Sequence, residues 1–438
     1  MSAAQPTLTT TPSAPTTPPA WPRIAASAMF ACGWGGNQFT PLLIMYRRVG
    51  GYSVLSVDMF LGAYVVGLIP GLLCAGPLSD RHGRRRVMFA GTVLSVIASA
   101  VLAFGAEGPW PIYAGRLLTG IAVGVAMSVG SSWVKELSTA SADATLGARR
   151  ASLWLTSGFG LGAGLAGLLA QWGPWPMVLP YVVHIALTLP VLALLPGVPE
   201  TRAASPGTVR GLLSDLRVPP RGRRRFRLLV LPMAPWVFGA AGLAYAVMPQ
   251  LVDDRLGDWG LVYATALTVL YLGAGVAVQP LAKRLDRARS APNPGVIAMT
   301  VMVAGTAVCA VDAVLRSPWL ALAAALVLGA GYGIAVVTGL LEVQRIAGAD
   351  DLAGLTGVYY ALAYAGFLLP TLLALMSVRV PYPVLLTGVA TVAAGCLAVV
   401  VHGVRRPEGR EVQEPLRGPE MRADVVERES RFRAAREE

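Results

Sequence analysis

The sequence predicts an all-α integral membrane protein with twelve transmembrane helices in two six-helix halves of similar pattern. Only 14% of its 438 residues are charged, about half the share that is usual in a soluble domain. No charged residue occurs between Arg23 and Arg47 or between Asp58 and Asp80. About 20 apolar residues cross the hydrocarbon core, and a charge at its centre costs about 2.5–3.5 kcal/mol. Charge-free windows of this length are therefore predicted membrane spans.

Similar windows with few or no charged residues continue along the chain as far as residue 404. The window at 151–199 is too long for one helix, and it divides at a turn that Trp172 and Trp175 flank, as interfacial tryptophans do. The window at 108–134 contains one arginine, Arg116. The predicted spans fall within 24–46, 59–79, 87–106, 108–134, 151–199 (two spans), 228–252, 259–282, 290–311, 317–341, 352–378 and 380–404.

The distribution of basic residues predicts the orientation. With both termini in the cytoplasm, 30 of the 36 Lys and Arg residues face the cytoplasm, 5 face outside and Arg116 lies within a span. Cytoplasmic loops carry such an excess, so the basic run at 221–227 is interpreted as a topology signal, and no nucleic-acid partner is expected. Arginine outnumbers lysine 34 to 2, a skew associated with bacterial genomes of high GC content. We therefore expect a multi-pass protein of a bacterial inner membrane.

The chain divides into five predicted segments. Residues 1–20 are rich in Pro, Thr and Ser, have no charge and are predicted to be disordered. The two six-helix halves are 21–200 and 228–404. A basic cytoplasmic linker at 201–227 joins them, and a charged, disordered cytoplasmic tail follows at 405–438.

The two halves repeat each other. Gly120 and Gly124 of the fourth span recur as Gly329 and Gly333 of the tenth, and the segment at 76–84 resembles that at 279–287. Duplicated halves of this kind place a binding site at their interface near the membrane midplane. A small-molecule solute in contact with both halves is therefore the expected partner, beside the lipid bilayer itself.

A motif in the loop after the second span carries a family resemblance. It comprises Gly76, Leu78, Ser79, Asp80, Arg81, Gly83, Arg84 and Arg85. This loop resembles the loop 2–3 signature of the major facilitator superfamily. The resemblance implies that Asp80 bonds to the start of the eleventh span, at 352–357, when the cytoplasmic side is closed. The alternative is that the loop only anchors the topology.

The fourth span adds to the resemblance. Arg116, Gly120, Gly124 and Glu136 resemble the family's span-four pattern, which includes its sugar-porter form, and Arg149 resembles a basic residue that opens span five. The resemblance implies a cytoplasmic charge cluster of Glu136, Arg84 and Arg149 with Asp80. The exporter signature of span five and the glutamine pair that sugar porters carry in span seven are both absent.

Candidate cavity residues are the polar and aromatic groups at mid-span. Arg116 corresponds to Ala325 in the second half. An unpaired guanidinium within a span is either a functional group or a structural arginine that snorkels to the outer surface or bonds backbone carbonyls. Asn37 and Gln38 need partners inside the membrane. The aromatic candidates, for which helix packing is the alternative, are Trp34, Trp236, Tyr245, Tyr332, Tyr359, Tyr360 and Tyr364.

The expected function is secondary transport by alternating access of the two halves. Proton-coupled export of a drug-like or natural-product compound is the first expectation, with protons as coupling ion. Uptake of a small metabolite is the alternative, an anionic one if Arg116 binds it, and a transporter-like membrane sensor is the alternative from another class. Catalysis is not expected, because His82, His184 and His402 have no spacing typical of a metal site or a triad. No metal, cofactor or oligomeric partner is expected, so the protein should be a monomer.

Overall fold

The computed structural model describes residues 20–138, 146–202, 218–287, 292–347 and 352–405. These residues form helices joined by short loops and contain no strand. The predicted disordered segments at the two termini and most of the predicted linker lie outside the described residues. The main helices are α1 Trp21–Asn37, α3 Val54–His82, α4 Arg84–Leu102, α5 Pro109–Val125, α6 Ser131–Leu137, α7 Leu146–Trp172, α8 Leu179–Leu194, α11 Leu231–Gly242, α13 Gly260–Arg287, α14 Pro294–Leu315, α15 Pro318–Ile346, α16 Leu352–Ala365, α17 Leu369–Ser377 and α18 Tyr382–Arg405.

The predicted number of spans is confirmed, with one difference in the first span. Among the described residues, eleven helical stretches are long and apolar enough to cross a membrane. The first span is broken into α1, the short helix η1 Thr40–Leu42 and α2 Leu43–Arg48. Pro41 lies in η1 and has no backbone N–H to continue a helical ladder. The twelfth span is therefore present, but it bends.

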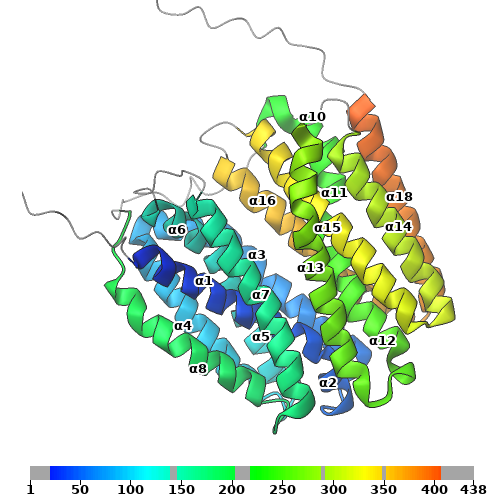
Figure 1. The fold of residues 1–438 in the computed structure, drawn as a ribbon, viewed down its shortest axis with the longest axis horizontal. Helices are drawn as coiled ribbons and strands as arrows, with labels where there is room; N and C mark the ends of the chain where they lie inside the picture. Colours follow the sequence, from blue (N-terminus) through cyan, green and yellow to red (C-terminus); the bar gives the residue numbers. More distant parts are fainter. Residues whose placement is uncertain (1–19, 139–145, 203–217, 288–291, 348–351, 406–438) are drawn as a thin grey trace, which may run out of the picture.

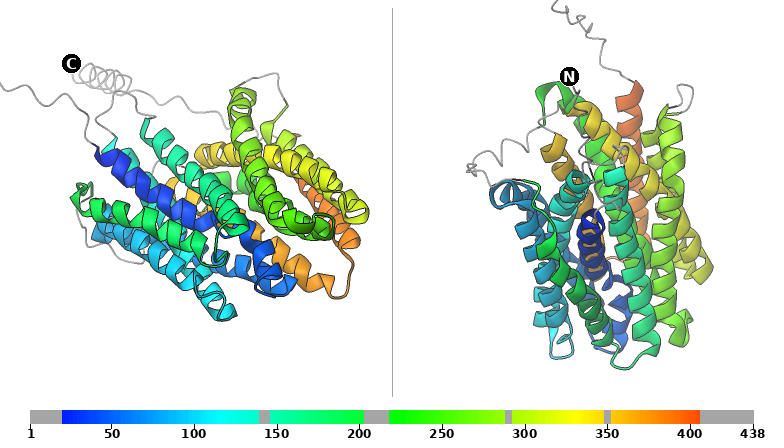
Figure 2. Two further views of the ribbon diagram at one scale, coloured as in Figure 1. Left: turned by 60° about the horizontal axis from the view of Figure 1, so that its bottom comes forward. Right: turned by 60° about the vertical axis from the view of Figure 1, so that its left-hand side comes forward.

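The helices form two bundles that lie side by side (Figure 1). The N-half contains α1 to α8, coloured blue to green, and the C-half contains α10 Arg223–Arg225 to α18, coloured green to orange. Within the halves α3 packs on α5 and α13 packs on α15. Across the junction α7 contacts α13 and α3 contacts α16, and the views in Figure 2 show the same two bundles from other sides.

The internal repeat is confirmed by close approaches between matching helices. A Cβ built on Gly120 would lie 2.1 Å from the carbonyl oxygen of Tyr64, and one built on Gly329 would lie 2.4 Å from that of Tyr271. Only glycine permits backbones to approach so closely. The contact of the second span with the fourth therefore recurs between the eighth and the tenth.

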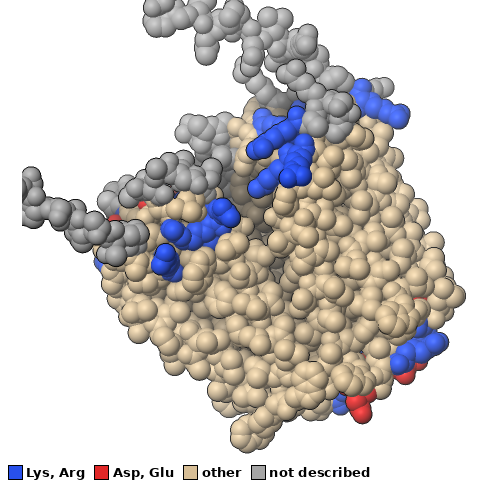
Figure 3. All heavy atoms as spheres, in the orientation of Figure 1, with Lys and Arg blue, Asp and Glu red and all other residues tan. Residues whose placement is uncertain are grey.

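Most of the basic side chains gather at one end of the molecule, and a mixture of acidic and basic side chains lies at the opposite end (Figure 3). We call the first of these the basic end; it contains the loop between α3 and α4 and the start of the C-half at α10. The surface in Figure 3 is hollowed between the two halves at this end. At the opposite end, which contains Arg48 and Asp253, acidic and basic side chains are paired.

A candidate substrate cavity between the halves

A cavity of about 50 Å³ lies between the two halves. Side chains of both halves line it, and most of them are aromatic or apolar. Its lining consists of Gly36, Asn37, Thr40, Leu61, Tyr64, Arg116, Phe159, Phe238, Tyr245, Leu272, Tyr332, Tyr364 and Phe367. An apolar pocket with a few polar groups is typical of small-molecule sites.

Arg116 is the one charged side chain of this lining. It is 1% exposed and lies between two rings, with its guanidinium carbon 4.4 Å from the ring centres of both Phe39 and Tyr64. Its Nε donates to the carbonyl of Phe60 at 3.4 Å, and its Nη1 donates to that of Gly36 at 3.3 Å. The side chain therefore does not snorkel to the surface, but it does bond backbone carbonyls, as the structural alternative expects.

No carboxylate of the described residues pairs with Arg116. Its Nη2 makes no hydrogen bond to the part of the chain that the structure describes. The residue that corresponds to Arg116 in the C-half is Ala325, which is fully buried and uncharged. Cation–π contacts compensate for part of the lost hydration of a buried guanidinium. A planar cation with a free edge at a cavity is suited to bind a carboxylate.

Aromatic rings of the C-half form the facing wall. The rings of Phe238 and Tyr364 are stacked, with centres 4.0 Å apart and planes 17° from parallel, and Phe367 stacks on Phe238 at 5.0 Å. Tyr364 also donates a hydrogen bond to the sulfur of Met127, 3.2 Å away in the other half. This wall offers flat apolar faces to a planar solute.

Irregular turns lie next to the cavity. The helical segments η2 Ala126–Gly130 and η6 Leu243–Val247 are π-helical turns. The first contains Met127 and the second contains the cavity residue Tyr245. Such single turns inside α-helices occur frequently at functional sites.

The predicted cavity residues divide into two groups. Arg116, Asn37, Tyr245, Tyr332 and Tyr364 line the cavity, and Asn37 donates to the carbonyl of Phe159 at 3.0 Å. The other five candidates lie outside the lining. Gln38 bonds to Ser99 within the N-half, the ring of Trp34 lies beside that of Phe30, Trp236 is part of a hydrophobic core cluster, and Tyr359 and Tyr360 contact each other.

Helical geometry explains this division. Neighbouring helical residues point about 100° apart, so Asn37 and Gln38 cannot face the same space. Trp236 and Tyr245 are nine residues apart, which places them on opposite faces of a helix. Phe238, missed by the sequence reasoning, is seven residues before Tyr245 and shares its face. That spacing was the signal that could have found it; Tyr64, Phe159 and Phe367 were missed without such a signal.

The cavity is closed at the end opposite the basic end. Arg48 of α2 lies 2.6 Å from the carboxylate of Asp253 and donates to the carbonyl of Gly257 at 2.6 Å. Nearby, the side chain of Gln250 in α12 Met248–Val252 donates to Asp58 of α3 at 3.1 Å. These contacts tie the first and second spans to the seventh, across the junction of the halves.

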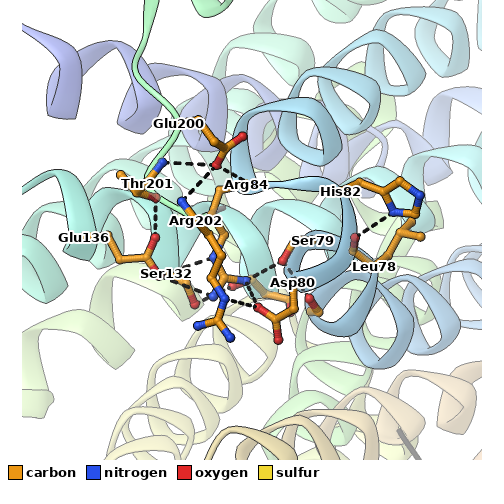
Figure 4. A network of polar contacts seen from close by, with 12 residues as sticks. Leu78, Ser79, Asp80, His82, Arg84, Ser132, Glu136, Glu200, Thr201 and Arg202 are labelled. Carbon is orange, nitrogen blue, oxygen red and sulfur yellow. Dashed lines mark hydrogen bonds and ion pairs between the residues drawn. The ribbon is translucent and has the colours of Figure 1, made fainter. Parts of the chain in front are cut away.

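The loop motif forms a network at the basic end (Figure 4). Gly83 has φ +92° between α3 and α4, a conformation that favours glycine. The carboxylate of Glu200 accepts from the backbone N–H groups of Arg84 and Arg85 at 2.7 and 3.1 Å. An anion at the start of a helix satisfies its free N–H groups, so the end of the sixth span fixes the start of α4.

Ion pairs of the predicted charge cluster extend this network. Arg84 lies 3.0 Å from Asp80 and 3.3 Å from Glu136, and Arg202 lies 3.3 Å from Asp80. The expected fourth member, Arg149, is exposed on α7 and joins no ion pair of the cluster. Its neighbour Arg150 bonds to Ser138 instead, because the two arginines point about 100° apart on the helix.

The remaining motif residues support the loop. Gly76 lies close to the side chain of Ser128 of η2, and Arg81 is exposed. Asp80 makes both of its ion pairs within the N-half, so the expected bond to 352–357 is not formed in this state. The C-half has its own cluster, in which Arg345 joins Glu342 and Asp286, and Arg225 joins Glu342. Among the described residues no ion pair links the halves at the basic end.

Comparisons with known proteins agree with this architecture. The gallate transporter of Pseudomonas putida is 36% identical over 153 residues, which are 33% of this chain and 31% of that protein. The 4-hydroxybenzoate transporter PcaK of Pseudomonas aeruginosa is 29% identical over 213 residues, 47% and 43% of the two chains. The multidrug efflux pump LfrA of Mycolicibacterium smegmatis is 31% identical over 148 residues, 33% and 28%. Each match spans less than half of the relative.

The fold itself matches solved transporters over most of their length. The crystal structure of a D-xylose–proton symporter superposes with a TM-score of 0.64 at 16% identity, and the match covers 87% of this chain and 95% of that one. A family model described as Major Facilitator Superfamily matches residues 24–371. The protein is thus a multi-pass membrane protein, and it belongs to the Major Facilitator Superfamily of transporters.

Proposed function

We propose that the protein is a secondary transporter that moves a small aromatic carboxylate across the membrane by alternating access of its two halves. The observation that carries this proposal is Arg116, a buried cation at the cavity without a carboxylate partner among the described residues. A solute carboxylate would supply the missing anion through a two-pronged hydrogen bond. The stacked rings of Phe238 and Tyr364 would hold the solute's own ring.

Two relatives support this solute class by their names. Gallate and 4-hydroxybenzoate, after which they are named, are both small hydroxylated aromatic acids. The matches cover less than half of each relative, so the substrate comes to this chain only as a proposal. This solute class corresponds to the alternative of an anionic metabolite and not to the first expectation of a drug-like compound.

Export of a drug-like compound is the second candidate. The similarity to a multidrug efflux pump and the aromatic lining support it. Many such compounds are cations, however, and Arg116 would repel a cation in the cavity. The repulsion between the two charges is strong because the surrounding dielectric constant is low. The anionic solute is therefore preferred. Protons remain the proposed coupling ion for either direction.

The proposed orientation follows from charge. With the basic end in the cytoplasm of a bacterial inner membrane, both termini are cytoplasmic and the positive-inside rule is satisfied. The contacts of Arg48 and Asp58 then close the outer side, and the structure is an inward-facing state. Each half rocks against the other around the cavity, and a single chain contains the complete site.

The test is exchange of labelled 4-hydroxybenzoate in proteoliposomes at neutral pH, with protein-free liposomes as the control for passive entry. We expect unlabelled aromatic carboxylates to exchange for the label. Their neutral amides should not, because they lack the anion for Arg116. Exchange of the amides at the same rate, or of planar cations instead of the acids, would refute the proposed solute class.

A further inference from the structure

Among the described residues, neighbouring side chains at the closed end carry buried polar atoms without hydrogen-bond partners. These atoms are Asp58 Oδ2 on α3 and Gln250 Oε1 on α12, and Arg47 Nη1 on α2 joins them. Buried polar atoms in folded proteins are nearly always hydrogen-bonded. Two unpartnered acceptors in one contacting pair therefore indicate that a donor is missing between the two side chains.

Asp58 lies where the two halves contact each other. The side chain is 0% exposed, and its Oδ1 accepts the hydrogen bond from Gln250 Nε2 at 3.1 Å. The backbone oxygen of Asp58 accepts from Thr371 Oγ1 of α17 at 2.7 Å. Two elements of the C-half thus contact Asp58 and contribute to its burial.

The titratable groups near Asp58 form no ion pair with its carboxylate. Arg47 of α2 and Tyr382 of α18 are the titratable groups that act on it electrostatically, while the contacts from α12 and α17 are uncharged. Arg47 forms no ion pair with Asp58, and its Nη1 is itself without a partner. An ionised carboxylate buried with one hydrogen bond is very costly. A proton on Oδ2 removes that charge and supplies the missing donor for Gln250 Oε1.

We propose that Asp58 is a proton-binding site that is occupied whenever this end of the molecule is closed. The protonated carboxyl group and the amide of Gln250 then form a reciprocal pair across the halves, each giving and accepting one hydrogen bond. The only bond made is O–H, and the proton comes from the medium that this end faces when it opens. The site is separate from Arg116 and gives the closed end its own dependence on external pH. The inference rests on the proposed alternating access, because it requires this end to open.

The direction of the pH dependence follows from proton counting. The closed state binds one proton more than the open state, so a higher external pH favours the open state. A one-proton difference changes the ratio of open to closed by at most about tenfold per pH unit. Asp58→Asn keeps the shape, stays neutral and can donate to Gln250, so it should keep this end closed at every pH.

The test measures how fast a membrane-impermeant maleimide labels Leu61→Cys from outside in right-side-out vesicles. Leu61 lies on α3 one turn beyond Asp58 and lines the cavity, so it is reached only when this end opens. Cys74 and Cys396 are replaced by serine in all variants because they are at least partly exposed. Cys32 and Cys309 are kept because they are buried. At each pH, the labelling rate is divided by that of the Asp58→Asn variant, which removes the intrinsic pH dependence of the thiol.

We expect this ratio to exceed one and to rise with pH, by up to about tenfold per unit. Gln250→Leu removes the reciprocal partner and should label faster than the parent throughout. Asp312→Asn is the matched control, since Asp312 is a buried carboxyl group with an unpartnered Oδ2 that caps Ser317 within the C-half; it should keep the pH response of the parent.

The outcomes separate this inference from the proposed transport. A flat ratio, or loss of the pH response in the Asp312→Asn control, overturns the proton site and leaves alternating access intact. Faster labelling of Asp58→Asn than of the parent would mean that an ionised Asp58 holds the end closed, which also overturns it. Absence of labelling in every variant would overturn alternating access and this site with it.

Discussion

The guanidinium of Arg48 and the carboxylate of Asp253 meet 2.6 Å apart and join the end of the first span to the end of the seventh. Arg48 also donates to the backbone oxygens of Gly257 and Asp253, so one side chain makes several bonds across the halves. Both side chains are partly exposed, and exposed ion pairs contribute only about 0.2–1 kcal/mol. The pair therefore makes a small contribution to the stability of the closed state and does not by itself keep this end closed.

A double-mutant cycle on this pair tests that interpretation. We expect Arg48→Ala and Asp253→Ala each to speed external labelling of Leu61→Cys about two- to fivefold, because each removes bonds made only in the closed state. The double variant should add little to the larger single effect. Fully additive effects would show that the two side chains act independently.

The motif at the basic end gives a second prediction. Asp80 is half exposed, and its Oδ1 lacks well-directed hydrogen bonds to Arg84 and Arg202, so it can leave these partners at low cost. If it bonds to 352–357 when this end closes, Asp80→Asn should shift the equilibrium toward the open state about ten- to a hundredfold. We expect normal amounts of folded protein and strongly reduced exchange. Asp254→Asn, at an exposed ion pair of the opposite end, is the control and should exchange normally; equal rates in both variants would assign the loop to topology alone.

Much of the architecture could be predicted from the sequence because membrane spans have strong signals. A charge-free window is a direct consequence of the cost of a buried charge, and glycines at fixed offsets mark close helix contacts. Arg116 stood out for the same reason, since a charge inside such a window needs an explanation. The Gly120 and Gly329 contacts confirm the repeat at the level of helix packing, since each meets the backbone of the neighbouring span.

The facing of individual residues could not be predicted equally well. Spans that are apolar all round show no polar stripe to distinguish the cavity side from the lipid side. Trp236 and Phe238 are both aromatic, and only the folded structure shows that Phe238 is the one that lines the cavity. The partner of the start of α4, Glu200, is more than a hundred residues away in sequence, and no local pattern gives that distance.

Close helix packing in the N-half gives a third prediction. A Cβ on Gly120 would lie 2.1 Å from the backbone oxygen of Tyr64, which cannot move like a side chain, whereas a Cβ on Gly160 of α7 would meet nothing within 4 Å. Gly120→Ala should separate α3 from α5 and cost about 1–3 kcal/mol, visible as a lower melting temperature in detergent. Gly160→Ala should melt like the parent. Equal melting of both variants would contradict the close approach.

The proposed orientation is tested by reporter fusions. Fusions after Pro196, after Arg287 and at Glu438 should report the cytoplasm, and fusions near Asp254 and Arg379 should report the outside. The reason is the split of 30 basic residues against 5, which the positive-inside rule assigns to the cytoplasm. A cytoplasmic signal near Asp254 would contradict the orientation.

Arg116 gives the last prediction, because its two explanations differ in what lysine can replace. The guanidinium lies between Phe39 and Tyr64 and bonds two backbone oxygens, while its remaining edge is available to a solute carboxylate. Lysine keeps the charge but loses the planar fork that holds two acceptors and stacks between rings. Arg116→Lys should therefore reduce exchange of aromatic carboxylates nearly as much as Arg116→Ala does.

The measurement is exchange by purified protein, with the melting temperature of each variant as a control for folding. If Arg116 only fills the N-half core, both variants should be less stable, and the exchange that remains should show an unchanged affinity for the carboxylate. If it binds the solute, Arg116→Lys should raise the half-saturating concentration about tenfold or more, because losing one charge-assisted hydrogen bond costs roughly 1.5–3 kcal/mol. Wild-type affinity in a stable Arg116→Lys protein would remove Arg116 from the site and leave Asn37 as the leading polar group of the cavity.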